Sequence, residues 1–195
     1  ADAYKTPLGL IDIERSTVQD LLKHPYCTSI DDIHNEEHSI QIELPFIQHA
    51  CPGSPVIPLV LGRCNTQTIV GLANLIKPFL TEQSLIVISS DFTHYGQQFG
   101  YTPFQNQVAA NIKALDIKAC RYIASGDRQS FSDFVDETPT TICGKDAIQL
   151  LMNCFNKQTH QGTLLDYARS GDMTADYSHS VSYASILFEG DWKVA

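Results

Sequence analysis

The chain has 195 residues, which is enough for one domain with a sizeable core and short for two. A hydrophobic content of 43% and a charged content of 18% are typical of globular proteins and exclude a disordered chain. The formal net charge is −9 and the lysines and arginines are scattered, which disfavours nucleic acid and anionic membrane surfaces as partners. No stretch approaches the roughly 20 apolar residues that cross a bilayer.

The cysteines carry no disulfide or zinc-ribbon pattern. None of the six forms a CxxC pair, and the first residues lack the pattern of a signal peptide. We therefore expect reduced thiols in a cytoplasmic compartment, most of them buried as small packing residues. The six are Cys27, Cys51, Cys64, Cys120, Cys143 and Cys154.

The first half of the chain predicts helices and two buried strands. Apolar spacing predicts helices over residues 17–23 and 38–50, the second kinked or shortened by Pro45. The runs VIPLVL (56–61) and SLIVIS (84–89) have the length and β-branched content of strands. Between them, Asn65 is placed to cap a helix.

These two apolar runs lack polar alternation, which is typical of strands buried on both faces of a parallel sheet. Strand, helix and strand together form a right-handed crossover unit. No repeat or Gly/Ser-rich linker divides the chain. The sequence therefore predicts a single α/β domain over residues 1–195 with a mainly parallel central sheet flanked by helices. Further helices are expected over 104–115, 127–135 and 144–155, and further strands over 163–168 and 181–188.

The stretch SSDFTHYG (89–96) directly follows a predicted central strand. In open α/β sheets ligands bind beyond the carboxyl ends of the strands, so Asp91 and His94 stand where a site is expected. An Asp and a His three residues apart can share a proton, bind a metal or orient one another. The alternative is a capping Asp and a surface His in a turn.

The stretch DDIHNEEHSI (31–40) concentrates carboxylates and two histidines before an apolar helical pattern. His34 and His38 would share one face of a helix, which superficially resembles a zinc helix, but the glutamate is misplaced. The alternative is an acidic helix start that complements the helix dipole. We favour that alternative for His34 and leave both interpretations open for His38.

The stretch TTICGKD (140–146) places Cys143 at the start of a predicted helix. The positive end of the helix dipole favours a thiolate, which is both a nucleophile and a metal ligand. A nucleophilic pair of Cys143 with His94 is therefore one candidate, and a buried structural cysteine is another.

Five segments together resemble one protein family, the Memo family, and do so in the same order along essentially the whole chain. Each is moderately specific, and the five in register make a strong resemblance. They are DAYKTPLG (2–9), EHSIQIELP (37–45), SSDFTHYG (89–96), TICG (141–144) and SVSYAS (180–185).

The resemblance implies a fold similar to the class III extradiol dioxygenases, with a pocket that holds iron or copper and no organic cofactor. It implies that His38 and Cys143 are metal ligands and that Asp91 and His94 are catalytic or supporting residues of the same pocket. His94 stands where the dioxygenases have their acid/base histidine. A cysteine in place of a carboxylate makes the site softer, which favours copper or redox chemistry.

The family also has an N-terminal segment with a His-Ala-Gly motif that supplies another ligand histidine. That motif does not appear in these 195 residues, so we expect the domain to lack its N-terminal strands and the metal pocket to be incomplete. A sheet without those strands would expose an edge, and we expect self-association through it.

Three functions follow from the resemblance. The first is a metal-binding protein with a redox or regulatory role, and the second is a non-haem Fe(II) extradiol-type dioxygenase. The third is a signalling adaptor that binds a peptide without catalysis. The partner at the pocket would be a small molecule or a peptide. Hydrolysis by Cys143 is a weaker fourth alternative.

Overall fold

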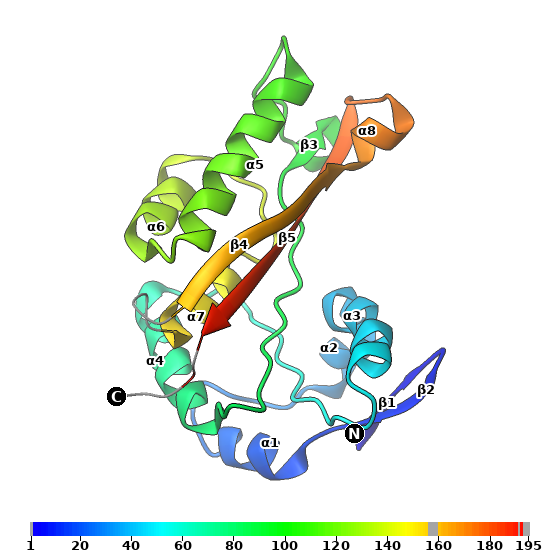
Figure 1. Ribbon diagram of the computed structural model, residues 1–195, viewed down its shortest axis with the longest axis vertical. Helices are drawn as coiled ribbons and strands as arrows, with labels where there is room; N and C mark the ends of the chain where they lie inside the picture. The colour runs from blue at the N-terminus through cyan, green and yellow to red at the C-terminus, as the bar shows by residue number, and fades with distance from the viewer. Residues whose placement is uncertain (1, 156–159, 191, 193–195) are drawn as a thin grey trace. The chain divides into compact units, whose positions relative to one another are not determined.

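The computed structural model describes residues 2–155, 160–190 and 192 (Figure 1). The chain divides into two compact units, Ala1–Phe79 and Leu80–Ala195, and each is described here by itself. None of the helices in these ranges combines the length and the apolar character that crossing a membrane requires.

The first unit joins a small hairpin to four helices. Strands β1 (Ala3–Thr6) and β2 (Gly9–Asp12) pair antiparallel, and Ile13 continues into a parallel bridge with Val56. The Gln48 side chain of the third helix donates to the Leu10 carbonyl of the hairpin at 3.0 Å. The helices are α1 (Arg15–Leu21), α2 (Asp31–Glu36), α3 (His38–Ala50) and α4 (Thr66–Ile76), followed by the short 3-10 turn η1 (Lys77–Phe79).

Two helices of this unit begin directly after residues whose side chains cap them. Asn65 caps α4 as predicted, because its side-chain oxygen accepts a hydrogen bond from the Thr68 amide at 2.9 Å. Glu37 does the same for α3, since its carboxylate accepts from the Ser39 amide at 2.9 Å. The predicted helix over 38–50 is confirmed at both ends, and it begins at His38 although Pro45 lies inside it.

The second unit packs helices against a three-stranded antiparallel sheet in the order β3-β5-β4 (Figure 1). The predicted tail strands are confirmed and are longer than expected, because they form one extended hairpin. The strands are β3 (His94–Gly96), β4 (His160–Arg169) and β5 (His179–Gly190). The helices are α5 (Val108–Ala124), α6 (Arg128–Glu137), α7 (Lys145–Cys154) and α8 (Ser170–Thr174), with the 3-10 turn η2 (Gln97–Phe99) after β3.

Helix α5 begins later and runs further than the predicted 104–115. Its start is displaced because the Tyr95 hydroxyl donates to the Phe104 carbonyl at 2.6 Å and holds that residue in the preceding loop. Its end is extended because buried Ala119, Cys120 and Ile123 continue the apolar spacing up to the turn at Gly126. Helices α6 and α7 lie where the sequence predicted them.

The mixed α/β class is confirmed, but the mainly parallel central sheet is not. The strands described here pair antiparallel, and neither 56–61 nor 84–89 forms a strand, apart from the single parallel bridge at Val56. In the second run, Leu85 and Val87 are 70% and 42% exposed, whereas Ile88 packs on the core. An apolar run predicts an extended backbone, but the hydrogen-bond partner that makes a strand comes from elsewhere in the chain.

The core of the second unit lies between its helices and the β4–β5 hairpin. Ala119, Phe131 and Met152, of α5, α6 and α7 respectively, are almost fully buried, and Phe92 reaches them from the segment before β3. Side chains of the hairpin close the other side. This packing fixes the position of the residues just after Phe92.

One buried thiol of this core gives a pH-dependent prediction. Burial, reinforced by the charge of Asp116, raises the pKa of Cys120 to about 12. The pKa of a cysteine thiol in an unfolded chain is about 8.5. Between about pH 9 and 12 the unfolded chain therefore releases a proton that the folded chain keeps. We predict that the free energy of unfolding falls across this window, by up to about 1.4 kcal/mol per pH unit from this group.

Urea unfolding at a series of alkaline pH values measures that slope. Cys120→Ala is expected to lower stability at neutral pH and to make the alkaline slope shallower. A slope equal in the variant and the natural sequence would show that Cys120 ionises alike in both states.

Candidate functional site

The predicted site residues of the second unit lie beside β5. Two backbone hydrogen bonds pair the segment before β3 with β5. The Phe92 amide donates to the Ser182 carbonyl at 2.8 Å, and the Ser182 amide donates to the Thr93 carbonyl at 3.0 Å. β3 then pairs His94 with Val181. Asp91 and His94 are therefore held at the start of a paired segment, whereas the sequence placed them after a parallel strand.

The Asp91 backbone contacts both the side chain and the backbone of Cys143. The Asp91 amide donates to the Cys143 sulfur at 3.2 Å, and the Cys143 amide donates to the Asp91 carbonyl at 3.3 Å. Cys143 is exposed and stands just before Gly144, the N-terminal cap of α7. The predicted position of this cysteine at a helix start is confirmed.

Ser90 and Gly144 bring these two segments close together. The Gly144 amide donates to the Ser90 hydroxyl at 2.9 Å. A Cβ atom on Gly144 would lie 2.5 Å from the Ser90 Cβ and 2.9 Å from the Ser89 carbonyl oxygen, so a side chain at this position does not fit. The glycine of the TICG motif is thus required by the approach of residues 89–90.

The His94 ring lies between two oxygen acceptors. Nδ1 is 2.9 Å from the Thr141 carbonyl oxygen, and Nε2 is 3.6 Å from an Asp91 carboxylate oxygen. A carbonyl oxygen only accepts, so the proton of a neutral ring belongs on Nδ1 and leaves the Nε2 lone pair available. The His94 side chain is 19% exposed and that of Asp91 is 45% exposed, so solvent reaches both.

Thr141 fixes both the backbone and the ring of His94. Its hydroxyl accepts from the His94 amide at 2.7 Å and donates to the His94 carbonyl at 3.2 Å, in addition to the ring contact of its own carbonyl. Sequence reasoning singled out Cys143 in this motif and missed Thr141 and Ser90. The one available signal was that hydroxyl residues flank the cysteine and the aspartate.

His38 belongs to the first unit, where it opens α3. It is exposed, and its charge contributes to lowering the pKa of Glu37, which is lowered chiefly by the hydrogen bond from the Ser39 amide. His34 instead contacts the Tyr4 hydroxyl through Nδ1 at 2.9 Å, which supports the structural interpretation of that histidine. The role of His38 as a metal ligand stays a prediction.

Asp91 contacts both other predicted site residues of this unit, Cys143 through its backbone amide and His94 through its carboxylate. Within residues 2–155, 160–190 and 192, no three or more His, Cys, Asp or Glu side chains are grouped closely enough to hold a metal ion. None of the hydrogen bonds described for this part of the chain joins Cys143 to His94. A nucleophilic Cys143–His94 pair therefore has no support in this geometry.

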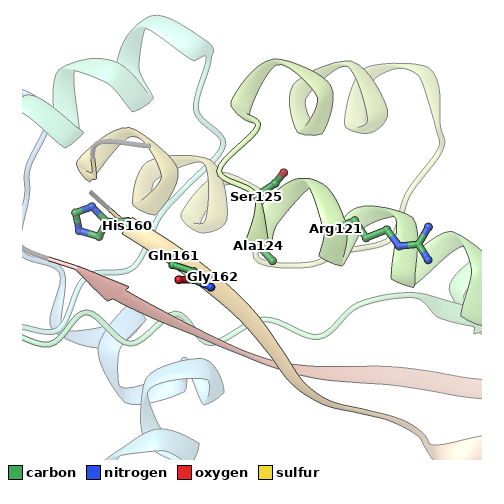
Figure 2. A pocket seen from close by; sticks show the side chains of 6 residues that line it. All are labelled: Arg121, Ala124, Ser125, His160, Gln161 and Gly162. Atoms are coloured by element: carbon green, nitrogen blue, oxygen red, sulfur yellow. The ribbon is translucent and has the colours of Figure 1, made fainter. Parts of the chain in front are cut away.

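A separate hollow lies between the end of α5 and the start of β4 (Figure 2). It has a volume of about 540 Å³, opens widely to solvent, and is lined by Arg121, His160 and Gly162 among others. Gly162 is required there because a Cβ atom would lie 2.4 Å from the Ala124 carbonyl oxygen. None of the predicted site residues lines this hollow.

Comparison with known proteins matches the sequence of this chain to one family. The family model described as Memo-like protein matches residues 1–187. A MEMO1 family protein of Methanosarcina mazei is 29% identical over 194 residues, covering 96% of this chain and 68% of that protein. The protein memo-1 homolog of Caenorhabditis elegans is 28% identical, covering 95% of this chain and 57% of its own length.

Protein MEMO1 of Rattus norvegicus is 29% identical over 198 residues, covering 94% of this chain and 67% of its own length. The chain thus spans between 57% and 68% of the length of these three relatives.

The tight approach at Gly144 gives a test of the site geometry. We predict that Gly144→Ala lowers the free energy of unfolding by about 1–3 kcal/mol, because the new methyl group overlaps Ser90 and the Ser89 carbonyl. Urea unfolding measures the loss. Adding Ser90→Gly removes two of the three close contacts, so the double variant should recover part of it, and strictly additive losses would contradict the geometry.

Proposed function

The chain belongs to the Memo family, and we propose that it binds an iron or copper ion with Cys143 and His38 among the ligands and has a redox or regulatory role. The observation that carries the proposal is the exposed Cys143 sulfur, which the Asp91 amide contacts while the Asp91 carboxylate faces His94. A thiolate with an imidazole is a donor set that suits copper and iron better than hard cations such as magnesium.

The donor chemistry of the described residues fits such an ion in kind. Cys143 offers an exposed sulfur as a ligand, whereas His94 and Asp91, whose Nε2 and carboxylate oxygen lie 3.6 Å apart, are proposed as acid/base partners rather than ligands. A bound ion of this kind supplies Lewis-acid or one-electron chemistry. His38 enters the proposal only through the match of its motif to the family.

The roles of the protein groups follow from their contacts. Thr141 orients His94 so that its Nε2 atom can take up a proton. The Asp91 carboxylate lies on the Nε2 side of the ring and can accept that proton. Asp91 also donates its amide to the Cys143 sulfur, which restricts where the thiol can lie. His94 is thus proposed as an acid/base group and Asp91 as its partner.

Elemental analysis tests the metal proposal directly. We predict that the full-length protein, purified without chelators or affinity metals, contains iron or copper. Cys143→Ser should weaken the affinity for that metal by at least about tenfold, because a hydroxyl is a far poorer ligand for these ions than a thiolate. His38→Ala should weaken it similarly.

Cys64→Ser is the matched control, because Cys64 contacts the Gly62 carbonyl through a bond that a hydroxyl can also make. Its metal affinity should equal that of the natural sequence. An affinity that Cys143→Ser leaves unchanged would count against the proposal.

Extradiol-type ring cleavage with Fe(II) is a second candidate, favoured by the paired His94 and Asp91. The thiol of Cys143 argues against it, because a thiolate exposed to oxygen is itself oxidised. If cleavage occurs, the anaerobically iron-loaded full-length protein should consume oxygen with a panel of catechols. His94→Gln should then slow the reaction by about 10²–10⁴-fold, the usual contribution of one acid/base group. No oxygen uptake with any catechol would remove this candidate.

A further inference from the structure

Helix α5 carries a carboxylate that the proposed function does not use. Asp116 is 1% exposed and stands one helical turn from Ile112 and Cys120, which are also buried. A buried carboxylate costs free energy unless hydrogen bonds satisfy it, and an apolar side chain of similar size would fill this position at lower cost. Its contacts therefore indicate what the residue is for.

Both carboxylate oxygens of Asp116 are hydrogen-bonded. Oδ1 accepts from the Thr93 hydroxyl at 2.6 Å and from the Thr93 amide at 3.3 Å. Oδ2 accepts from the Tyr167 hydroxyl at 2.7 Å, which itself lies 3.3 Å from the Ser182 hydroxyl. One side chain of α5 thus bonds directly to the segment before β3 and to β4, and through Tyr167 it is connected to β5.

The partners of Asp116 are neutral donors. None of the ion pairs found among the described residues involves it. Burial raises the pKa of Tyr167, and the charge of Asp116 raises it further, so the phenol stays protonated and keeps donating. A charged acceptor with neutral donors makes short, directional hydrogen bonds, which suits a fixed anchor.

Thr93 is the residue through which this anchor reaches the site. It is fully buried and lies between Asp91 and His94 in the chain. Its amide and hydroxyl are bound by Asp116, and its carbonyl accepts from the Ser182 amide at 3.0 Å. Each polar group of Thr93 is thus engaged, so the backbone from Phe92 to His94, which also leads to Asp91, is fixed from inside the core.

We infer that Asp116 is a positioning residue of the site, which acts through Thr93 to hold Asp91 beside Cys143 and His94 against Thr141. The inference deepens the proposed function, and its metal-binding part rests on that function. The orientation of His94 depends on the fold alone and is tested without a metal.

Thr93→Val tests the inference with little change in shape, because it removes only the hydroxyl that donates to Asp116. The measurement is the ¹⁵N spectrum of the His94 ring in the metal-free protein, well below the unfolding temperature. The natural sequence should show a proton on Nδ1, donated to the Thr141 carbonyl. Thr93→Val should shift His94 toward the Nε2-protonated form that an unrestrained imidazole prefers.

Two further variants separate positioning from stability. Thr93→Ser keeps the hydroxyl and should restore the His94 spectrum of the natural sequence. Ile112→Val lowers stability from the same helix without removing any hydrogen bond of Asp116, and should leave the His94 spectrum unchanged. An unchanged spectrum in Thr93→Val, or an equal change in Ile112→Val, would overturn the inference.

Titration with Fe²⁺ under anaerobic conditions gives the second readout. Thr93→Val should bind Fe²⁺ about tenfold more weakly than Thr93→Ser, as expected when a group that supports a metal site is lost. If the natural sequence binds neither Fe²⁺ nor copper, the proposed function fails, and the ring spectrum alone decides whether Asp116 positions the site. Equal Fe²⁺ affinities in the two Thr93 variants would count against its metal-binding part.

Discussion

The antiparallel pairing of residues 92–96 with β5 is the constraint on which the site depends. The hydrogen bonds from Phe92 and to Thr93 set the register, and β3 extends it from His94 to Gly96. Phe92 and Thr93 are buried in the core, so the Asp91 and His94 side chains on either side of them lie at its rim. The buried carboxylate of Asp116 reinforces the same segment from the opposite side.

Helix α7 is joined to this segment by polar contacts at its start. Gly144 meets Ser90, Cys143 meets Asp91, and Thr141 meets His94 in three successive contacts. Each of them includes a backbone group, so the two segments run past one another at a fixed spacing. A site assembled in this way keeps its geometry even though the side chains of Asp91 and Cys143 reach solvent.

The sequence predicted the helices well because capping residues and apolar spacing are local signals. Asn65, Asp127 and Gly144 mark helix starts that the structure confirms. The sheet was harder to predict, because the partner of an extended run is not encoded in the run itself. The motifs identified Asp91, His94 and Cys143 by residue type, but Thr93 and Asp116 are 23 residues apart and no short-range pattern connects them.

Asp91 links the two reactive groups of the site through different parts of the same residue. Its backbone amide donates to the Cys143 sulfur, whereas its carboxylate faces the His94 ring. The contact with the sulfur would survive any side chain at position 91, so the surroundings of the thiol depend on how the segment is held. The partner of the imidazole depends instead on a carboxylate being present. The fold therefore governs where the Cys143 sulfur and the His94 ring lie, and residue type governs only which group faces that ring, so the buried anchor at Asp116 bears on both residues.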